Sequence, residues 1–276
     1  MCDVSCRVPE RLRSALPSPK PIPAPAFALR KTMPMNPQDS IVDASSRFIQ
    51  GRHGLLSLLP QEQDVVARCL RRYGEWAEQE LELLAGLLLP GHHVLEFGGH
   101  YGAQTLPFAK LVGETGAVHV VEPERLAFQQ VCANLAINGI CNAHAHEQYL
   151  GSSVGAADAD PRAARPGSVD ALALPQLNLM KVNIPGALKE LLAGAQDTLR
   201  QSRPYIHFLQ GDLEDAAEEI EIVKALGYRC WSHVTYLFSG SNALGETRNL
   251  FPGRVQQSVL ALPVEAAFDL PQLIEL

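Results

Sequence analysis

The chain has 276 residues, of which 46% are hydrophobic, 19% charged and 6% aromatic. This length and apolar content are enough to build a folded core, and they exclude intrinsic disorder over most of the chain. The 30 acidic residues outnumber the 23 basic ones, which gives a net charge of −7. A protein that binds nucleic acid needs a basic surface to neutralise phosphates, so we expect no nucleic-acid partner unless a local basic patch exists.

The sequence also bears on membrane association and compartment. No apolar run reaches the roughly 18–20 residues that span a bilayer, and the first residues lack the continuous apolar core of a secretory signal. The six cysteines are scattered and form no CxxC pair, which is typical of reduced thiols. We therefore expect a cytoplasmic protein with no membrane partner.

Composition divides the chain into three parts. Residues 1–38 are rich in proline and predict an extended, disordered tail, although a mitochondrial-type presequence or a start at Met33 or Met35 stays open. Residues 39–90 predict an N-terminal helical cap, with helices at 60–72 and 74–89. In the second helix, apolar residues recur at three- and four-residue spacings and form one stripe: Ala77, Leu81, Leu84 and Leu88. The neighbouring glutamates are expected largely outside this stripe.

Residues 91–276 alternate between short apolar runs and amphipathic segments. The apolar runs predict strands at 93–98, 117–121, 143–146, 177–184, 205–209, 228–234 and 258–262. The segments between them predict helices at 105–112, 126–138, 187–201 and 216–226. This alternation is typical of an α/β fold, with a mostly parallel sheet and helices on both faces.

A glycine-rich turn follows the first of these strands, which ends at Glu96 and continues into Gly98–Gly102. In parallel sheets, ligands bind where strands end and loops cross, and glycines let the backbone approach a ligand closely. A branched side chain at Gly98 should therefore block the ligand and leave the fold intact. His100 stands where a dinucleotide fingerprint needs glycine, which weakens but does not remove a nicotinamide oxidoreductase as an alternative.

Acidic residues at the strand ends indicate what the turn binds. The second strand ends at Glu122, twenty residues beyond Gly102, where an acid can accept hydrogen bonds from both hydroxyls of a ribose. Glu96 would repel a pyrophosphate and suits an amine-bearing ligand. These features together predict S-adenosylmethionine as the cofactor, with Glu147 at the adenine. The expected cofactor-binding residues are Glu96, Gly98, Gly99, His100, Tyr101, Gly102, Glu122 and Glu147.

Several segments together resemble the FkbM family of S-adenosylmethionine-dependent methyltransferases, over residues 48–263. They are Arg52–Gly54, Tyr73–Trp76, Val94–Gly102, Gly116–Glu124, Glu122–Gly139, Val169–Asp170, Lys181–Gly186, Arg203–Pro204, Gly227–Tyr228 and Asn249–Phe251. The resemblance implies the Rossmann-like seven-stranded class I methyltransferase fold. It also implies methylation of hydroxyl groups on sugars or secondary metabolites.

The chain departs from that family at the ends of two strands. Where the family usually reads Lys-Ile-Asp-Val-Glu-Gly, this chain reads Lys-Val-Asn-Ile-Pro-Gly, so an acid has become Asn183 and another Pro185. Leu209 stands where the fifth strand of the family usually ends in glutamate. Three carboxylates are thus absent from the border of the expected methyl-transfer pocket, although Asp212 and Glu214 could substitute from the next loop.

The catalytic candidates are Lys181, Asn183 and His207. Lys181 suits support of a carboxylate or of the backbone better than a role as base. His207 and His233 are candidate bases, because an imidazole titrates near the working pH.

The sequence therefore predicts an S-adenosylmethionine-dependent methyltransferase that methylates a hydroxyl of a small molecule or sugar. The alternative is a cofactor-binding pseudoenzyme or partner protein that has lost methyl transfer. We expect no metal: His144 and His146 share one strand face and could chelate, but the sequence places no third ligand. A homo-oligomer is possible.

Overall fold

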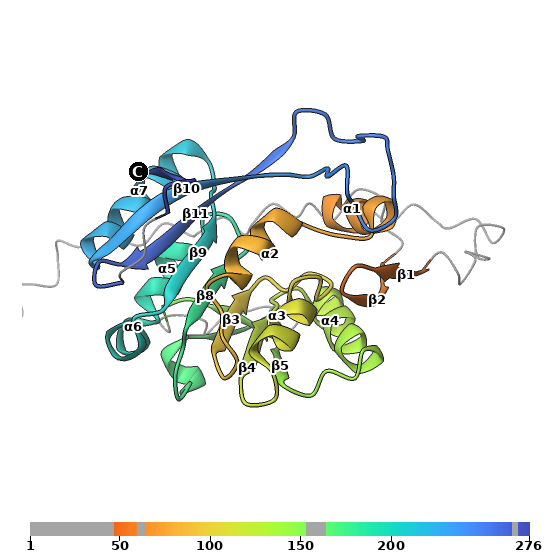
Figure 1. Ribbon diagram of the computed structural model, residues 1–276. Coiled ribbons are helices and arrows are strands. Elements are labelled where there is room, and N and C mark those ends of the chain that lie inside the picture. Colours follow the sequence, from red (N-terminus) through yellow and green to blue (C-terminus); the bar gives the residue numbers. More distant parts are fainter. Residues whose placement is uncertain (1–46, 60–63, 153–163, 267–269) are drawn as a thin grey trace, which may run out of the picture. The chain divides into compact units, whose positions relative to one another are not determined.

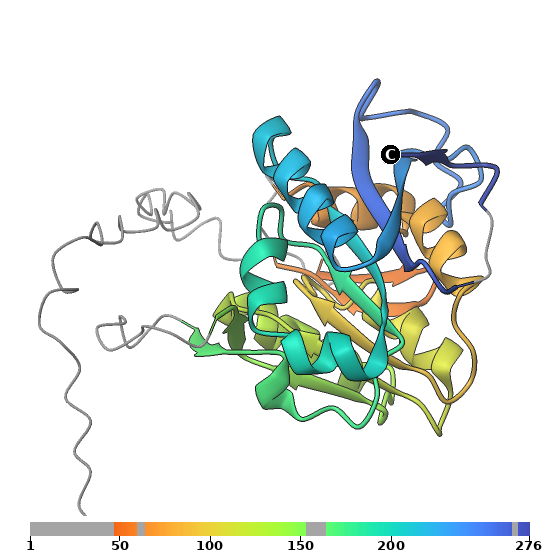
Figure 2. The ribbon, with the colours of Figure 1, turned by 90° about the vertical axis from the view of Figure 1, so that its left-hand side faces the viewer.

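The computed structural model describes residues 47–59, 64–152, 164–266 and 270–276, all of which belong to one compact unit, Asp43–Leu276. The tail predicted at 1–38 lies outside the described residues. A central sheet runs through the described part, with helices on both of its faces (Figures 1 and 2).

The central sheet has the strand order β12-β10-β11-β9-β8-β3-β4-β5 in the described residues. Its strands are β3 (His93–Phe97), β4 (Ala117–Val121), β5 (Ala143–His146), β8 (Leu179–Val182), β9 (Tyr205–Leu209), β10 (Tyr228–Tyr236), β11 (Val255–Pro263) and β12 (Ile274–Glu275). Strands β5, β4, β3, β8 and β9 are parallel, and β11 is antiparallel to both β9 and β10. The predicted Rossmann-like class I methyltransferase fold is confirmed, and β12 adds a two-residue edge strand.

The helices of the described part are α1 (Val65–Tyr73), α2 (Glu78–Ala85), α3 (Thr105–Val112), α4 (Arg125–Ile137), α5 (Leu188–Ala193), α6 (Gln196–Ser202) and α7 (Leu213–Ala225). Helices α2 and α3 pack on one face of the sheet, and α5, α6 and α7 pack on the other (Figure 2). None of these helices is long and apolar enough to cross a membrane.

The single helix expected at 187–201 is two helices, α5 and α6, separated at Gly194. A Cβ atom at Gly194 would lie 2.2 Å from the carbonyl oxygen of Gly151. The backbone of this turn therefore passes so close to Gly151 that only glycine fits.

On one face of the sheet, the buried side chains change from apolar to polar towards the carboxyl ends of the strands. All four residues of β8 are buried, as expected for a parallel strand covered on both faces. On the face towards α2 and α3, the first half of the central strands packs apolar residues such as Val94 and Leu179. Nearer the carboxyl ends, the same face carries buried polar residues instead, namely Glu96, Lys181 and His207.

Two small sheets were not expected. Strands β1 (Phe48–Gly51) and β2 (Gly54–Ser57) form an antiparallel hairpin, and β6 (Gln148–Leu150) pairs in parallel with β7 (Arg165–Gly167). The region 39–90 thus contains a hairpin as well as helices. The hairpin docks on α4, where Asn134 Oδ1 accepts from the amide of Ser57 at 2.7 Å and Asn138 Oδ1 accepts from the amide of Leu55 at 2.9 Å.

Replacing Asn134 by alanine should destabilise the protein by roughly 3 kcal/mol, because its side chain satisfies several buried backbone groups. It is fully buried, and its amide also donates to the carbonyl oxygens of Ser57 and Tyr101. Urea unfolding measures the effect, and Gln129→Ala on the exposed side of α4 is the matched control. Equal effects of the two substitutions would contradict this role of Asn134.

Candidate functional site

The glycine turn joins β3 to α3 at the carboxyl edge of the sheet. Its backbone is left-handed at three positions, with φ of 91° at Gly98, 49° at His100 and 76° at Gly102. A Cβ atom at Gly98 would lie 3.0 Å from Ile184 and 3.1 Å from Cβ of Asn183. The expectation that a branched residue at Gly98 leaves the fold intact is therefore wrong, because such a residue would strain the turn itself.

Glu122 fastens this turn to the neighbouring strand. It follows β4, is 5% exposed, and accepts from the amide of His100 at 2.9 Å and from the amide of Glu124 at 3.0 Å. Burial raises the pKa of Glu122, while His100 and the two amide bonds oppose that rise. Each carboxylate oxygen can accept a second hydrogen bond, so the arrangement leaves capacity for a ligand hydroxyl.

The side chains of two other predicted cofactor residues, Tyr101 and Glu147, already have protein partners. The Tyr101 ring is buried in the cluster formed with Leu106 and Val131, and its carbonyl oxygen accepts from the Asn134 amide at 2.8 Å. Glu147 follows β5, is about one-third exposed and pairs with Arg125 at 3.2 Å. Its expected contact with an adenine stays a prediction.

Glu96 lies beneath the turn and is 1% exposed. Burial raises the pKa of Glu96 to about 8, although a hydrogen bond from Thr105 Oγ1 at 2.6 Å opposes this. The amide of Asn183 lies 3.4 Å from its other oxygen. Glu96 is therefore mostly a neutral carboxylic acid near pH 7, held by protein groups on both oxygens.

A buried ion pair lies next to Glu96. The ammonium of Lys181 on β8 contacts Glu80 Oε1 on α2 at 2.9 Å, and both side chains are fully buried. Gln104 donates to the same oxygen at 2.8 Å, and Ser258 donates to Glu80 Oε2 at 3.2 Å. Burial alone would raise the pKa of Glu80, but Lys181 and His207 lower it to about 2, so the carboxylate stays charged.

His207 and His233 continue this cluster towards β10. Burial lowers the pKa of His207 to about 3, and its Nε2 lies 3.3 Å from Nδ1 of His233 and 3.7 Å from Glu80 Oε2. His207 Nδ1 is buried and meets no hydrogen-bond partner in the described residues. Burying an unpaired nitrogen acceptor at Nδ1 costs less free energy than burying an unpaired N–H there. The proton of the neutral imidazole is therefore on Nε2.

The ligand atoms of Glu80, His207 and His233 lie within 4.8 Å of one another, a spacing that could hold a metal ion. A divalent ion would, however, stand beside the ammonium of Lys181 on the same carboxylate. It would also shift the proton of His207 onto the unpartnered Nδ1. Both effects favour the ion pair over a metal at this position.

The structure thus brings the three predicted catalytic residues, Lys181, Asn183 and His207, into one buried polar cluster with Glu96. Glu80 completes this cluster and was not predicted, because it was assigned to the exposed side of its helix. Its position three residues after Ala77 and four before Leu84 does place it on the apolar stripe. Asp212, by contrast, caps α7 by accepting from the amides of Glu214 and Asp215.

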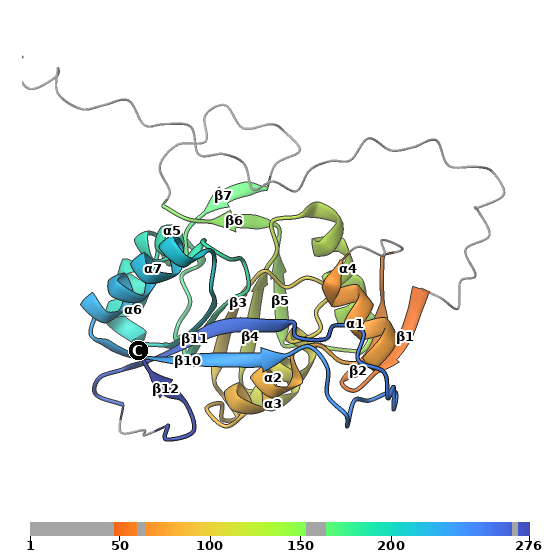
Figure 3. The same cartoon turned by 90° about the horizontal axis from the view of Figure 1, so that it is seen from above.

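Segments of the FkbM resemblance that are far apart in sequence meet beside α1. Arg52 donates to Glu75 Oε2 at 2.6 Å, and the amide of Ala243 donates to the same oxygen at 2.9 Å. The Tyr73 hydroxyl accepts from the amide of Leu250 at 2.8 Å, and its ring packs edge-on against Phe251. Figure 3 shows α2 beside β10 and α1 beyond the end of β10 and β11, next to the segment that joins these two strands.

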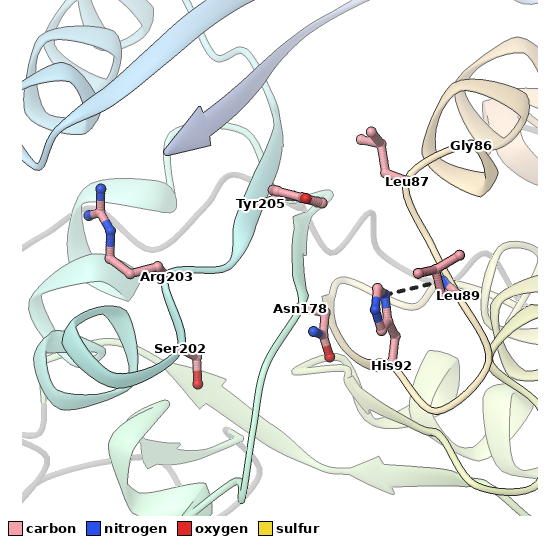
Figure 4. A pocket seen from close by; sticks show the side chains of 8 residues that line it. All are labelled: Gly86, Leu87, Leu89, His92, Asn178, Ser202, Arg203 and Tyr205. Atoms are coloured by element: carbon pink, nitrogen blue, oxygen red, sulfur yellow. Dashed lines mark hydrogen bonds between the residues drawn. The ribbon is translucent and has the colours of Figure 1, made fainter. Parts of the chain in front are cut away.

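A separate hollow of about 360 Å³ lies at the opposite edge of the sheet (Figure 4). Its lining residues precede β3 and β8 or begin β9, and they include His92, Asn178 and Tyr205. Since ligands of such sheets bind at the carboxyl ends of the strands, this hollow is not the candidate site.

Comparison with models of protein families finds no match, and comparison with curated protein sequences finds none. Among solved structures, the chain is similar to an S-adenosylmethionine-dependent O-methyltransferase from Thermotoga maritima (12% identity, 81% of this chain and 80% of that chain, TM-score 0.46). It is also similar to an S-adenosylmethionine-dependent methyltransferase from Aquifex aeolicus (15%, 67% and 89%, 0.43) and to an rRNA methylase from Streptococcus thermophilus (12%, 68% and 95%, 0.45). At such low similarity, these proteins do not decide the cofactor or the acceptor of this chain.

Glu96→Gln should change how stability depends on pH. Because the folded-state pKa of Glu96, about 8, lies above its ordinary 4.5, its protonation stabilises the fold fully below pH 4.5. That contribution, on the order of 4 kcal/mol, is lost as the pH rises through 8. Urea unfolding at about pH 5 and pH 9 should therefore show a smaller loss in the variant than in the natural protein. Equal losses would contradict the raised pKa, and Glu114→Gln on the surface is the control.

Proposed function

We propose that this protein is an S-adenosylmethionine-dependent methyltransferase of the FkbM type. The observation that carries the proposal is the position of the Gly98–Gly102 turn and of Glu122 at neighbouring strand ends. Strand β3 lies between β4 and β8, so the strand order reverses there, and open α/β sheets bind ligands at such a switch point. The FkbM assignment itself rests on the motifs quoted above.

The proposed cofactor lies across the carboxyl ends of three strands. Its ribose hydroxyls donate to Glu122 after β4, its adenine lies towards Glu147 after β5, and its methionine part lies against Gly98–Gly102. The helix α3 begins directly after this turn and directs its first amides towards the methionine part. Glu96, buried beneath the turn, acts through Thr105 and Asn183 rather than by direct contact.

The proposed reaction is O-methylation of a small molecule or sugar. S-adenosylmethionine would supply the methyl group: the acceptor oxygen would bond to the methyl carbon, the electron pair of the carbon–sulfur bond would stay on sulfur, and the hydroxyl proton would pass to water. Such a reaction depends mainly on alignment within a dry pocket. The FkbM resemblance supports a hydroxyl acceptor, and the net charge of −7 supports an acceptor other than nucleic acid. The scattered cysteines support a cytoplasmic setting.

A second candidate is a pseudoenzyme that binds the cofactor without transferring methyl. This candidate is favoured because the residues at the ends of β8 and β9 are poor proton acceptors. Asn183 and Leu209 cannot take a proton, and burial holds the pKa of His207 near 3. Binding of the cofactor with no methyl transfer to any acceptor in a broad extract screen would favour this candidate.

Calorimetry with S-adenosylhomocysteine tests the proposal directly. The natural protein should bind it, and Glu122→Gln should weaken binding about 10- to 100-fold, because a charged acceptor for the ribose hydroxyls is lost. Glu114→Gln on the surface should change nothing. An absence of binding, together with a rise in melting temperature on adding NAD(H), would replace this proposal with the oxidoreductase alternative.

EDTA should change neither the affinity for S-adenosylhomocysteine nor any methyl transfer. The reason is that Asn183 and Pro185 present no carboxylate at the end of β8, and hard divalent cations prefer carboxylate oxygens. The measurement is calorimetry and transfer of a labelled methyl group, each with and without the chelator. Strong inhibition that magnesium reverses would contradict this prediction.

A further inference from the structure

A chain of polar contacts runs from α2 to the glycine turn. Glu80 on α2 pairs with Lys181, and Lys181 in turn donates a hydrogen bond to Asn183 Oδ1. Asn183 Nδ2 then donates to the carbonyl oxygen of Gly98 at 3.0 Å. Three side chains, all buried, thus connect the N-terminal region to the turn proposed to hold the cofactor.

The charge on Lys181 determines which way Asn183 points. An ammonium can only donate, so Asn183 must face it with its carbonyl oxygen and must present its NH₂ group on the other side. That side holds two acceptors, the carbonyl oxygen of Gly98 and Oε1 of Glu96. The orientation is therefore the one that satisfies all of these groups.

An aspartate at position 183 could not make the same contacts as Asn183, because it has no NH₂ group to donate to the glycine turn. It could pair with Lys181, but its second oxygen would face the carbonyl oxygen of Gly98, and two acceptors cannot bond to each other. With an amide at 183, the buried ammonium needs a carboxylate from elsewhere, since an unpaired buried charge is strongly unfavourable. Glu80 supplies it, and Gln104 and Ser258 hold Glu80 in place.

We propose that Glu80 is a positioning residue for cofactor binding, which acts through Lys181 and Asn183 on the glycine turn. The proposal rests on the proposed function for the identity of the ligand. Cofactor affinity thus depends on the carboxylate of Glu80, which lies on α2 and belongs neither to the strands nor to the glycine turn. Glu80 itself contacts no ligand in this account.

A cycle of Glu80→Gln, Asn183→Asp and the double variant tests the proposal by calorimetry with S-adenosylhomocysteine. Glu80→Gln should lower the affinity at least tenfold, because Lys181 loses its carboxylate. Asn183→Asp alone should also lower it, because the turn then faces a second acceptor. In the Glu80→Gln background, however, the same aspartate restores a carboxylate to Lys181 and should raise the affinity at least threefold. Equal effects of Asn183→Asp in both backgrounds would overturn the proposal.

A second variant guards against misfolding of Glu80→Gln. The pair Glu80→Leu with Lys181→Met removes both charges at similar volume, which folded proteins tolerate well. This variant should still unfold in one cooperative transition, at a lower temperature because Gln104 and Ser258 lose their acceptor, and it should lose affinity at least tenfold because Asn183 is no longer oriented. Natural affinity in this variant would overturn the proposal. Glu218→Gln, which breaks the half-exposed pair with Lys189, is the control.

Failure of the proposed function gives a different result. If the natural protein binds no S-adenosylhomocysteine, that function fails, and the same four proteins of the cycle are compared by melting temperature. A reversal in the sign of the Asn183→Asp effect still supports the charge linkage from Glu80 to Asn183. Additive effects overturn it.

Discussion

The ion pair between Glu80 and Lys181 is the interaction on which the arrangement of this site depends. Removing both charges from water is costly, and the attraction between them offsets that cost only because other groups complete the hydrogen bonding. Gln104 and Ser258 donate to Glu80, and Asn183 accepts from Lys181. The pair therefore joins α2, β8, β11 and the glycine turn.

This pair lies at the position where the sequence departs most clearly from the FkbM pattern that it resembles. The family usually has an aspartate where this chain has Asn183, next to a lysine that both share. Here the carboxylate that neutralises the lysine comes from α2 instead, and the amide at 183 is free to donate to the turn.

The sequence predicts every strand of the main sheet except the two-residue β12, because the predicted strands are short runs rich in apolar residues and bounded by turn residues. The strand at 117–121 and the helix at 105–112 have the predicted bounds. The β1–β2 hairpin was missed, because what stabilises it is contact with Asn134 and Asn138, about 80 residues away. Such long-range partners leave no periodic signal in the hairpin itself.

The candidate site was predictable to a different extent. The glycine turn and Glu122 follow from where apolar runs end, and the structure places them side by side. Glu80 was missed because a glutamate on a helix is usually solvated, although its spacing from Leu84 places it on the buried stripe. The tertiary partner, Lys181, lies about 100 residues further along the chain and is what makes its burial tolerable.

A crystal structure of the complex with S-adenosylhomocysteine tests the central claim most directly. We expect the ligand at the carboxyl ends of β3 and β4, with its ribose hydroxyls on Glu122 and its amino acid part against Gly98–Gly102. We also expect that Asn183 keeps its contacts with Lys181 and Gly98. A ligand bound elsewhere, or bound here without contact to Glu122, would contradict the account.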